Sequence, residues 1–208
     1  MAPEKLSTGH AHVTALPPAS EPHPFEPFLP RNARILFLGS FPPQPKRWCM
    51  DFYYPNFIND FWRITGRLFF ADQDYFTDAG RRRFDKDRIV AFCNREGLAF
   101  YDTATEVRRL RDNASDRFLE VVTPTDLPDL LRRIPDCRAV ATTGQKATDT
   151  LCATLPCPPP PMGGYTDLSL AGRSLRFYRM PSTSRAYPLS LEKKAAAYRI
   201  LFEEVGLL

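Results

Sequence analysis

The sequence has little histidine, and the positions of its histidines limit the chemistry it can support. All three, His10, His12 and His23, lie within the first 23 of 208 residues. Catalytic triads built on histidine and imidazole metal sites both need that ring. We therefore expect the folded body to lack histidine and to contain neither a histidine-based triad nor an imidazole metal site.

Cysteine is present but not in a pattern that binds metal. The five cysteines are odd in number and include no Cys-x-x-Cys pair. This argues against a zinc site and against a disulfide framework. We expect no metal and no other cofactor.

Long apolar runs are absent as well. No segment approaches the length needed to span a bilayer, and the first residues lack the basic and apolar stretches of a secretory signal. The sequence predicts a cytoplasmic, nucleoid-associated protein with no membrane partner.

Positive charge is in modest excess and unevenly spread. The formal net charge is +4, yet residues 1–30 carry −2, which leaves +6 on the remaining 178 residues. Arginines cluster at 81–83 and 108–111. Basic groups of this kind bind phosphates without reading sequence. Acidic residues lie among them, so a solvated helix face is the alternative interpretation.

Composition divides the chain into three parts. Residues 1–22 are rich in Pro, Ala, Ser, Thr and His without periodicity and are expected to form a disordered tail. Residues 23–32 place Phe25, Phe28 and Leu29 between prolines and are expected to dock as an extended arm. Residues 33–208 are expected to form one domain.

Apolar runs alternate with helical patterns through that domain. Strands are predicted near 34–39, 98–102, 139–142 and 175–180, and helices near 59–69, 85–96, 126–134, 145–155 and from Ser190 onward. The charged stretch 103–122 is expected to leave the sheet. Alternation of this kind predicts an α/β fold, a three-layer α/β/α arrangement with a short parallel central sheet.

The loop after the first strand carries the strongest functional signal. Gly39-Ser40-Phe41-Pro42-Pro43 follows the apolar run, and Tyr53-Tyr54-Pro55-Asn56-Phe57-Ile58-Asn59-Asp60-Phe61-Trp62 leads into a helix. Ligands of open α/β sheets bind beyond the carboxyl ends of strands. Tyrosine faces stack on planar bases, and an amide orients water or reads a base edge. The loop therefore predicts a nucleobase pocket.

These residues, together with Met180-Pro181-Ser182-Thr183-Ser184-Arg185, resemble the two signature motifs of the uracil-DNA glycosylase superfamily. The Gly-Ser-x-Pro loop, the Tyr-Tyr pair and Asn-x-Phe-Trp are most similar to the hypoxanthine (deoxyinosine) DNA glycosylase branch. The second motif is also similar to mismatch-specific uracil- and thymine-DNA glycosylases. The resemblance covers roughly residues 33 to 206.

The resemblance implies a uracil-DNA glycosylase-like domain that acts in base-excision repair. It would flip a deaminated base, hypoxanthine or uracil, out of DNA and hydrolyse its N-glycosidic bond, without a cofactor and as a monomer. Flipping is needed because the bond is inaccessible inside the stack. No lysine is placed for catalysis, which implies a monofunctional enzyme that leaves the strand uncut.

Two residues are the catalytic candidates. The resemblance implies that Asn59 is the catalytic amide, which holds a water or bonds to the flipped base; an N-cap before the helix is the alternative role. The resemblance also places Ser40 where other branches carry a catalytic Asn or Asp. A serine cannot act as a carboxylate base, so positioning water and satisfying the amides of its own turn are both open.

The other candidates would hold the DNA. Phe41, Tyr54 and Asn56 are expected to bind the base, Tyr54 by stacking; plain packing is the alternative for Phe41. Ser182, Thr183, Ser184 and Arg185 are expected to contact the DNA backbone, where small residues allow close approach.

Asp102 ends a predicted strand and is either a general base or, as is usual for such an aspartate, a capping residue or the partner of an arginine such as Arg108. Two other functions also fit the sequence: a non-catalytic nucleic-acid-binding module, favoured by Ser40, and a hydrolase of small molecules or nucleotides.

Overall fold

The computed structural model describes residues 18–111 and 116–208. The predicted tail ends earlier than expected, because Ser20–Pro22 forms strand β1. The remainder of that prediction falls on residues 1–17, which lie outside the described residues.

The centre of the molecule is a five-stranded sheet in the order β3-β2-β6-β8-β7. Strands β2 (Ile35–Gly39), β3 (Leu98–Asp102), β6 (Ala139–Thr143) and β8 (Arg173–Met180) run parallel. Every residue of β2 and β3 is buried, as expected for strands covered on both faces. These four strands were predicted. Strand β7 (Tyr165–Leu170) was not, and it pairs antiparallel with β8 at the edge.

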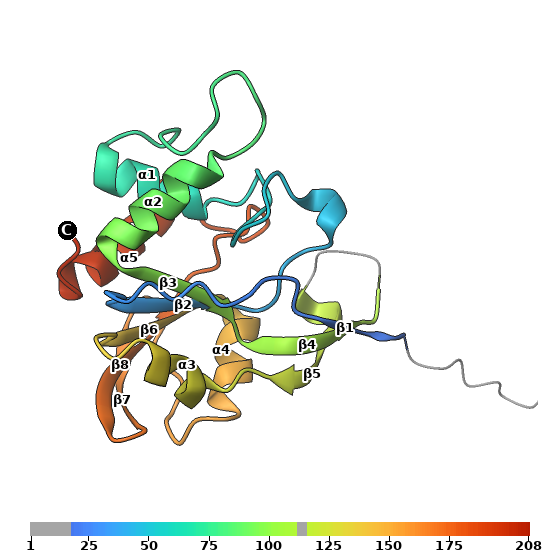
Figure 1. Cartoon of the computed structure of the whole chain (residues 1–208), viewed down its shortest axis with the longest axis vertical. Helices are drawn as coiled ribbons and strands as arrows, with labels where there is room; N and C mark the ends of the chain where they lie inside the picture. Colours follow the sequence, from blue (N-terminus) through green and yellow to red (C-terminus); the bar gives the residue numbers. More distant parts are fainter. Residues whose placement is uncertain (1–17, 112–115) are drawn as a thin grey trace, which may run out of the picture.

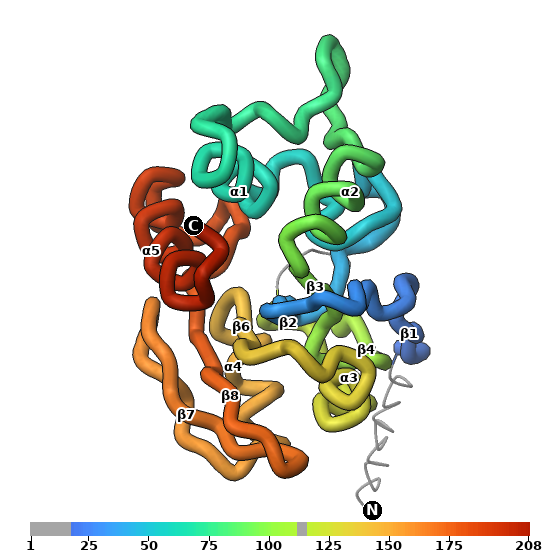
Figure 2. The backbone as a smooth tube through the Cα atoms, turned by 60° about the vertical axis from the view of Figure 1, so that its left-hand side comes forward, coloured from blue at the N-terminus to red at the C-terminus, as the bar shows by residue number. Residues whose placement is uncertain are grey.

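Helices cover both faces of this sheet, which confirms the three-layer prediction (Figure 1). Helices α1 (Phe61–Phe70), α2 (Lys86–Glu96) and α5 (Leu191–Glu204) lie on one side, and α3 (Leu127–Arg133) and α4 (Gln145–Cys152) on the other. Ser190 caps α5 as predicted, accepting a hydrogen bond from the Lys193 amide at 3.4 Å. Figure 2 shows α1 and α5 packed side by side.

The charged stretch that was expected to leave the sheet forms a second, smaller one. Strands β1, β4 (Ala104–Arg109) and β5 (Leu119–Pro124) pair antiparallel in the order β1-β4-β5. One face of the hairpin buries Ala104, Val107 and Leu119 against Phe41. Two short 3-10 helices follow β2 and precede β5 along the chain, at Pro45–Arg47 and Asp116–Phe118.

The arm at residues 23–32 docks onto the domain. Phe28 exchanges two backbone hydrogen bonds with Phe100 at 2.9 and 3.0 Å, which covers the edge of β3. The Tyr53 hydroxyl donates to the Glu26 carbonyl at 2.9 Å. His23 packs inside the molecule with a side chain only 2% exposed. The prediction that the folded body lacks histidine is therefore wrong, because the arm brings one in.

Within the described part of the chain, no helix is long and apolar enough to cross a membrane. No three His, Cys, Asp or Glu side chains among residues 18–111 and 116–208 are grouped so that they could hold a metal ion.

Candidate active site at the carboxyl ends of the strands

A pocket of about 940 Å³ opens where the parallel strands end. Its walls come from the segments that follow β2, β3, β6 and β8, and from the turn before β5. The two sequence motifs lie far apart in the chain, but the topology places both at this edge. All nine predicted site residues line the pocket: Ser40, Phe41, Tyr54, Asn56, Asn59, Ser182, Thr183, Ser184 and Arg185.

Tyr54 is held in an unusual backbone conformation at the pocket wall. Its φ is 52°, a left-handed value that costs roughly 1–2 kcal/mol for a residue with a side chain. Its ring stacks on Phe61 at 4.1 Å between centroids with the planes 4° apart. Its hydroxyl is 3.0 Å from Thr143 Oγ1, and burial raises the pKa of the phenol. A neutral, fixed aromatic ring results, with one face occupied by Phe61.

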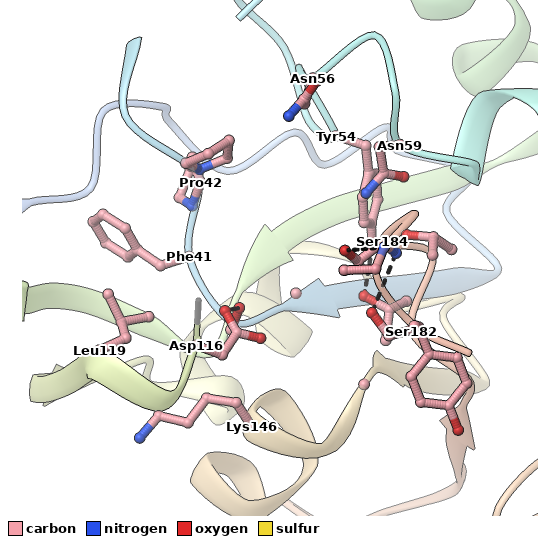
Figure 3. A pocket seen from close by; sticks show the side chains of 18 of the residues that line it. Phe41, Pro42, Tyr54, Asn56, Asn59, Asp116, Leu119, Lys146, Ser182 and Ser184 are labelled. Atoms are coloured by element: carbon pink, nitrogen blue, oxygen red, sulfur yellow. Dashed lines mark hydrogen bonds between the residues drawn. The ribbon is translucent and has the colours of Figure 1, made fainter. Parts of the chain in front are cut away.

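Both asparagines use their side-chain oxygen to shape the loop. Asn59 Oδ1 accepts from the Phe61 amide at 2.9 Å, and Asn56 Oδ1 accepts from the Ile58 amide at 3.2 Å. These bonds engage the oxygens and leave the Nδ2 donors for other partners. The N-cap of α1 is Asp60, so the capping alternative for Asn59 is wrong in detail: Asn59 lies one residue earlier, shapes the turn that enters α1, and also lines the pocket. Figure 3 shows Asn59 and Tyr54 close to the loop that carries Ser182 and Ser184.

Ser40 is paired with a carboxylate that the sequence did not single out. Its hydroxyl donates to Asp116 Oδ1 at 2.9 Å. Desolvation by the surrounding chain raises the pKa of Asp116, and the bond from Ser40 opposes that rise. Asp116 lies 76 residues away in the charged hairpin. Nothing in the local sequence distinguishes it from a solvated aspartate.

Phe41 is mainly a packing residue. It is 9% exposed, and it joins the apolar cluster of the small sheet. The Arg109 guanidinium carbon lies 5.5 Å from the centre of its ring. Packing buries most of the Phe41 side chain, in line with the packing alternative, and the residue also lines the pocket.

Asp102 lines the pocket at the end of β3 and bonds to a histidine rather than to an arginine. Its Oδ2 lies 2.9 Å from His23 Nε2, and the carboxylate is 9% exposed. Its Oδ1 lies 2.4 Å from the place where a Cβ on Gly39 would stand. Any side chain at residue 39 would therefore displace the carboxylate, which explains the glycine at the end of β2.

The second motif is fixed from behind by a buried ion pair. Lys194 Nζ lies 2.8 Å from Asp60 Oδ2 and donates to the Ser184 carbonyl, also at 2.8 Å. The Asp60 amide donates to the Thr183 carbonyl at 2.9 Å, and the Tyr198 hydroxyl to that of Pro181 at 3.0 Å. Helices α1 and α5 thus lock the loop.

On its outer side the same loop is open to solvent. The Ser182 hydroxyl accepts a hydrogen bond from the Ser184 amide at 3.2 Å, and the Ser184 hydroxyl accepts one from the Ala186 amide at 3.3 Å. The Arg185 side chain is 64% exposed and lies 3.7 Å from Asp60. The lining also includes the acidic residues Asp102, Asp116 and Asp149, and Arg109 in it is paired with Glu21 at 2.6 Å. The other cationic residues that line the pocket are Arg47, Arg117 and Lys146. A rim of this kind attracts anionic ligands.

Comparisons with known proteins bear on the fold. No family model and no curated protein matches the chain. A solution NMR structure from Methanosarcina acetivorans, described as a "putative Uracil DNA glycosylase", matches with a TM-score of 0.56 and 20% sequence identity. The match covers 85% of this chain and 96% of that one. The protein therefore has a fold of the uracil-DNA glycosylase type.

Proposed function

We propose that this protein is a monofunctional DNA glycosylase that removes a deaminated base, hypoxanthine or uracil. One observation carries the proposal. The first motif, with Tyr54 and Asn59, and the second motif, with Ser182 to Arg185, line a single pocket at the carboxyl ends of the strands. Its volume of about 940 Å³ is enough for a flipped nucleotide, since ligand pockets span about 300–1,000 Å³.

The pocket side chains suit the departure of a base. As the N-glycosidic bond breaks, its electron pair leaves with the base and positive charge develops on the sugar. The Asn59 oxygen is engaged by the Phe61 amide, so its Nδ2 group is the donor for the leaving base. Tyr54 would stack on the base with the ring face that Phe61 does not cover. Asn56, whose oxygen is engaged by the Ile58 amide, would donate from Nδ2 to an edge of the base.

The serine-rich loop suits the DNA backbone. Ser182, Thr183 and Ser184 are small, and α1 and α5 hold their backbone in place. Arg185 and the cationic rim would contact phosphates, which strengthens binding to any sequence. In this proposal Ser40 positions water or the Asp116 carboxylate near the sugar.

The hypoxanthine branch is the more specific part of the proposal. It is supported by the Tyr53-Tyr54 pair and by Asn59-Asp60-Phe61-Trp62. The enzyme would act on DNA as a monomer, without a cofactor, on the nucleoid in the cytoplasm.

A gel assay tests the proposal. Duplex and single-stranded oligonucleotides carrying uracil, hypoxanthine or xanthine are incubated with the protein and then treated with alkali. We expect alkali-dependent cleavage at the lesion and none in unmodified DNA. Binding without cleavage would support a non-catalytic module instead. Hydrolysis of free nucleosides alone would support a small-molecule hydrolase.

A further inference from the structure

A buried histidine–carboxylate pair lies at the carboxyl end of β3, where only its carboxylate lines the pocket, and the proposed roles of Asn59 and Tyr54 leave it unexplained. His23 and Asp102 are 79 residues apart, and their side chains are 2% and 9% exposed. Asp102 lines the pocket, whereas His23 lies behind it and comes from the arm. Removing a carboxylate from water costs free energy unless a hydrogen-bonding or charged partner compensates for the lost hydration. For Asp102 that partner is His23.

Both nitrogens of the His23 ring are engaged, so the ring has one orientation. Nε2 lies 2.9 Å from Asp102 Oδ2, and Nδ1 accepts from the Phe25 amide at 3.1 Å and lies 2.8 Å from the Phe25 carbonyl oxygen. The rings of Phe41 and Tyr101 pack at 5.1 and 4.6 Å between centroids. His23 therefore reaches the pocket only through the carboxylate.

The bond to His23 also orients Asp102. With Oδ2 held, Oδ1 lies against the backbone of Gly39, at the point where β2 gives way to the loop of the first motif. The titratable groups that interact with this carboxylate come from several elements: His23 from the arm, Tyr53 and Tyr54 from the loop, Tyr101 from β3, and Asp116 from the turn before β5. Burial raises the pKa values of Tyr53 and Tyr54, and the charge of Asp102 adds to the rise, so both stay neutral beside it.

We propose that Asp102 is the carboxylate that receives the proton of the attacking water, and that His23 is the positioning residue that aims it. The inference rests on the proposed glycosylase function. In the reaction, the bond between C1′ and the base nitrogen breaks and its electron pair leaves with the base. The water oxygen bonds to C1′, and the proton that this water loses goes to Asp102. The negative carboxylate also stabilises the positive charge that develops on the sugar.

The arm has other attachments, so His23 can be changed without releasing it. β1 pairs with β4, Phe28 pairs with Phe100, and the Glu26 carbonyl accepts from Tyr53. Variants of His23 should therefore keep the fold. This separates a role in aiming Asp102 from a role in docking the arm.

Single-turnover base release, lesion binding and thermal melting are measured on the full chain. Asp102→Asn keeps the shape and cannot take the proton, so release should fall by roughly 10²–10⁴-fold while lesion binding stays unchanged. Asp102→Ala should be equally slow, and added formate should restore part of its rate, because it supplies a carboxylate to the vacated space. His23→Gln should be faster than His23→Ala, since an amide can still donate to Asp102. Glu26→Gln, an exposed change on the same arm, is the matched control and should release base at the wild-type rate.

The outcomes separate this inference from the function it rests on. A wild-type protein that releases no base overturns both. An active wild type with an equally active Asp102→Asn overturns only the role of Asp102. The positioning role is overturned if His23→Ala releases base slowly only because the arm has detached. That outcome would appear as a lowered melting temperature, and His23→Gln would release base no faster than His23→Ala.

Discussion

At the scale of single residues, the site uses side chains for two purposes at once. Asn59 shapes the start of α1 with its oxygen and keeps its amino group for the pocket. Tyr54 packs on Phe61 with one face and bonds Thr143 through its hydroxyl. Such residues are poorly probed by alanine alone, because one change removes both roles. Conservative replacements separate them.

Asn59 can be divided into its two roles by two variants. Asn59→Ala should lose most base release and about 1 kcal/mol of stability, because both the amide donor and the bond to the Phe61 amide disappear. Asn59→Asp keeps an acceptor for that amide but lacks the donor, so it should recover stability and remain slow. Single-turnover rates and denaturant unfolding measure the two effects. Wild-type release by Asn59→Asp would contradict the donor role.

Tyr54 should bind a flipped base through its ring rather than its hydroxyl. Tyr54→Phe keeps the stack with Phe61 and should be tolerated. Tyr54→Ala should weaken the complex with lesion-containing DNA by roughly 1–3 kcal/mol and leave binding to undamaged duplex nearly unchanged. Fluorescence anisotropy on both DNAs gives the comparison. Equal weakening on the two would indicate a purely structural tyrosine.

At the scale of elements, α1 and α5 support the serine-rich loop through the Asp60–Lys194 pair. Lys194 is buried, with a side chain 1% exposed, and it reaches both the Asp60 carboxylate and the loop backbone. A buried pair contributes little net stability, but removing one partner leaves an uncompensated charge. The loop should therefore depend on this pair for its shape.

Lys194→Met should lower the free energy of unfolding by about 3–5 kcal/mol, because it removes the buried partner of Asp60 and leaves only the largely exposed Arg185 near that carboxylate. Lys193→Met, the exposed neighbouring lysine on α5, is the matched control and should change stability little. Denaturant unfolding of both proteins tests this. Similar midpoints for the two variants would mean that the ion pair does not anchor the loop.

Arg185 should act as a phosphate contact of the same loop. Arg185→Ala should weaken DNA binding whatever the base, and the slope of log affinity against log salt should become shallower by about 0.9 for duplex DNA. Arg199→Ala, an exposed arginine of α5 that pairs with Glu203, serves as the control. Titrations at several salt concentrations measure both slopes. If Arg185 is instead inserted into the base stack, the salt slope of Arg185→Ala should match that of the Arg199→Ala control. Base release from lesion DNA by Arg185→Ala should then be slower than by the wild type.

At the scale of the whole molecule, the sequence predicts what depends on local pattern and misses what depends on distant contacts. The buried runs of β2, β3 and β6 were visible because strands covered on both faces are largely apolar, and β8 was visible from its alternation of apolar and charged residues. β7 and the small sheet were not, since their strands are only partly buried and carry no continuous apolar run. His23 and Asp116 were missed because their partners, Asp102 and Ser40, lie 79 and 76 residues away.

The central claim is that this pocket hydrolyses the bond between a deaminated base and its sugar. The most direct measurement counts, in one reaction, the free base by mass spectrometry and the abasic sites in the lesion oligonucleotide. The account predicts equal amounts of free hypoxanthine or uracil and of abasic sites, on strands that stay uncut until alkali is added. Lesion DNA that is bound and recovered intact, with no free base, would contradict it.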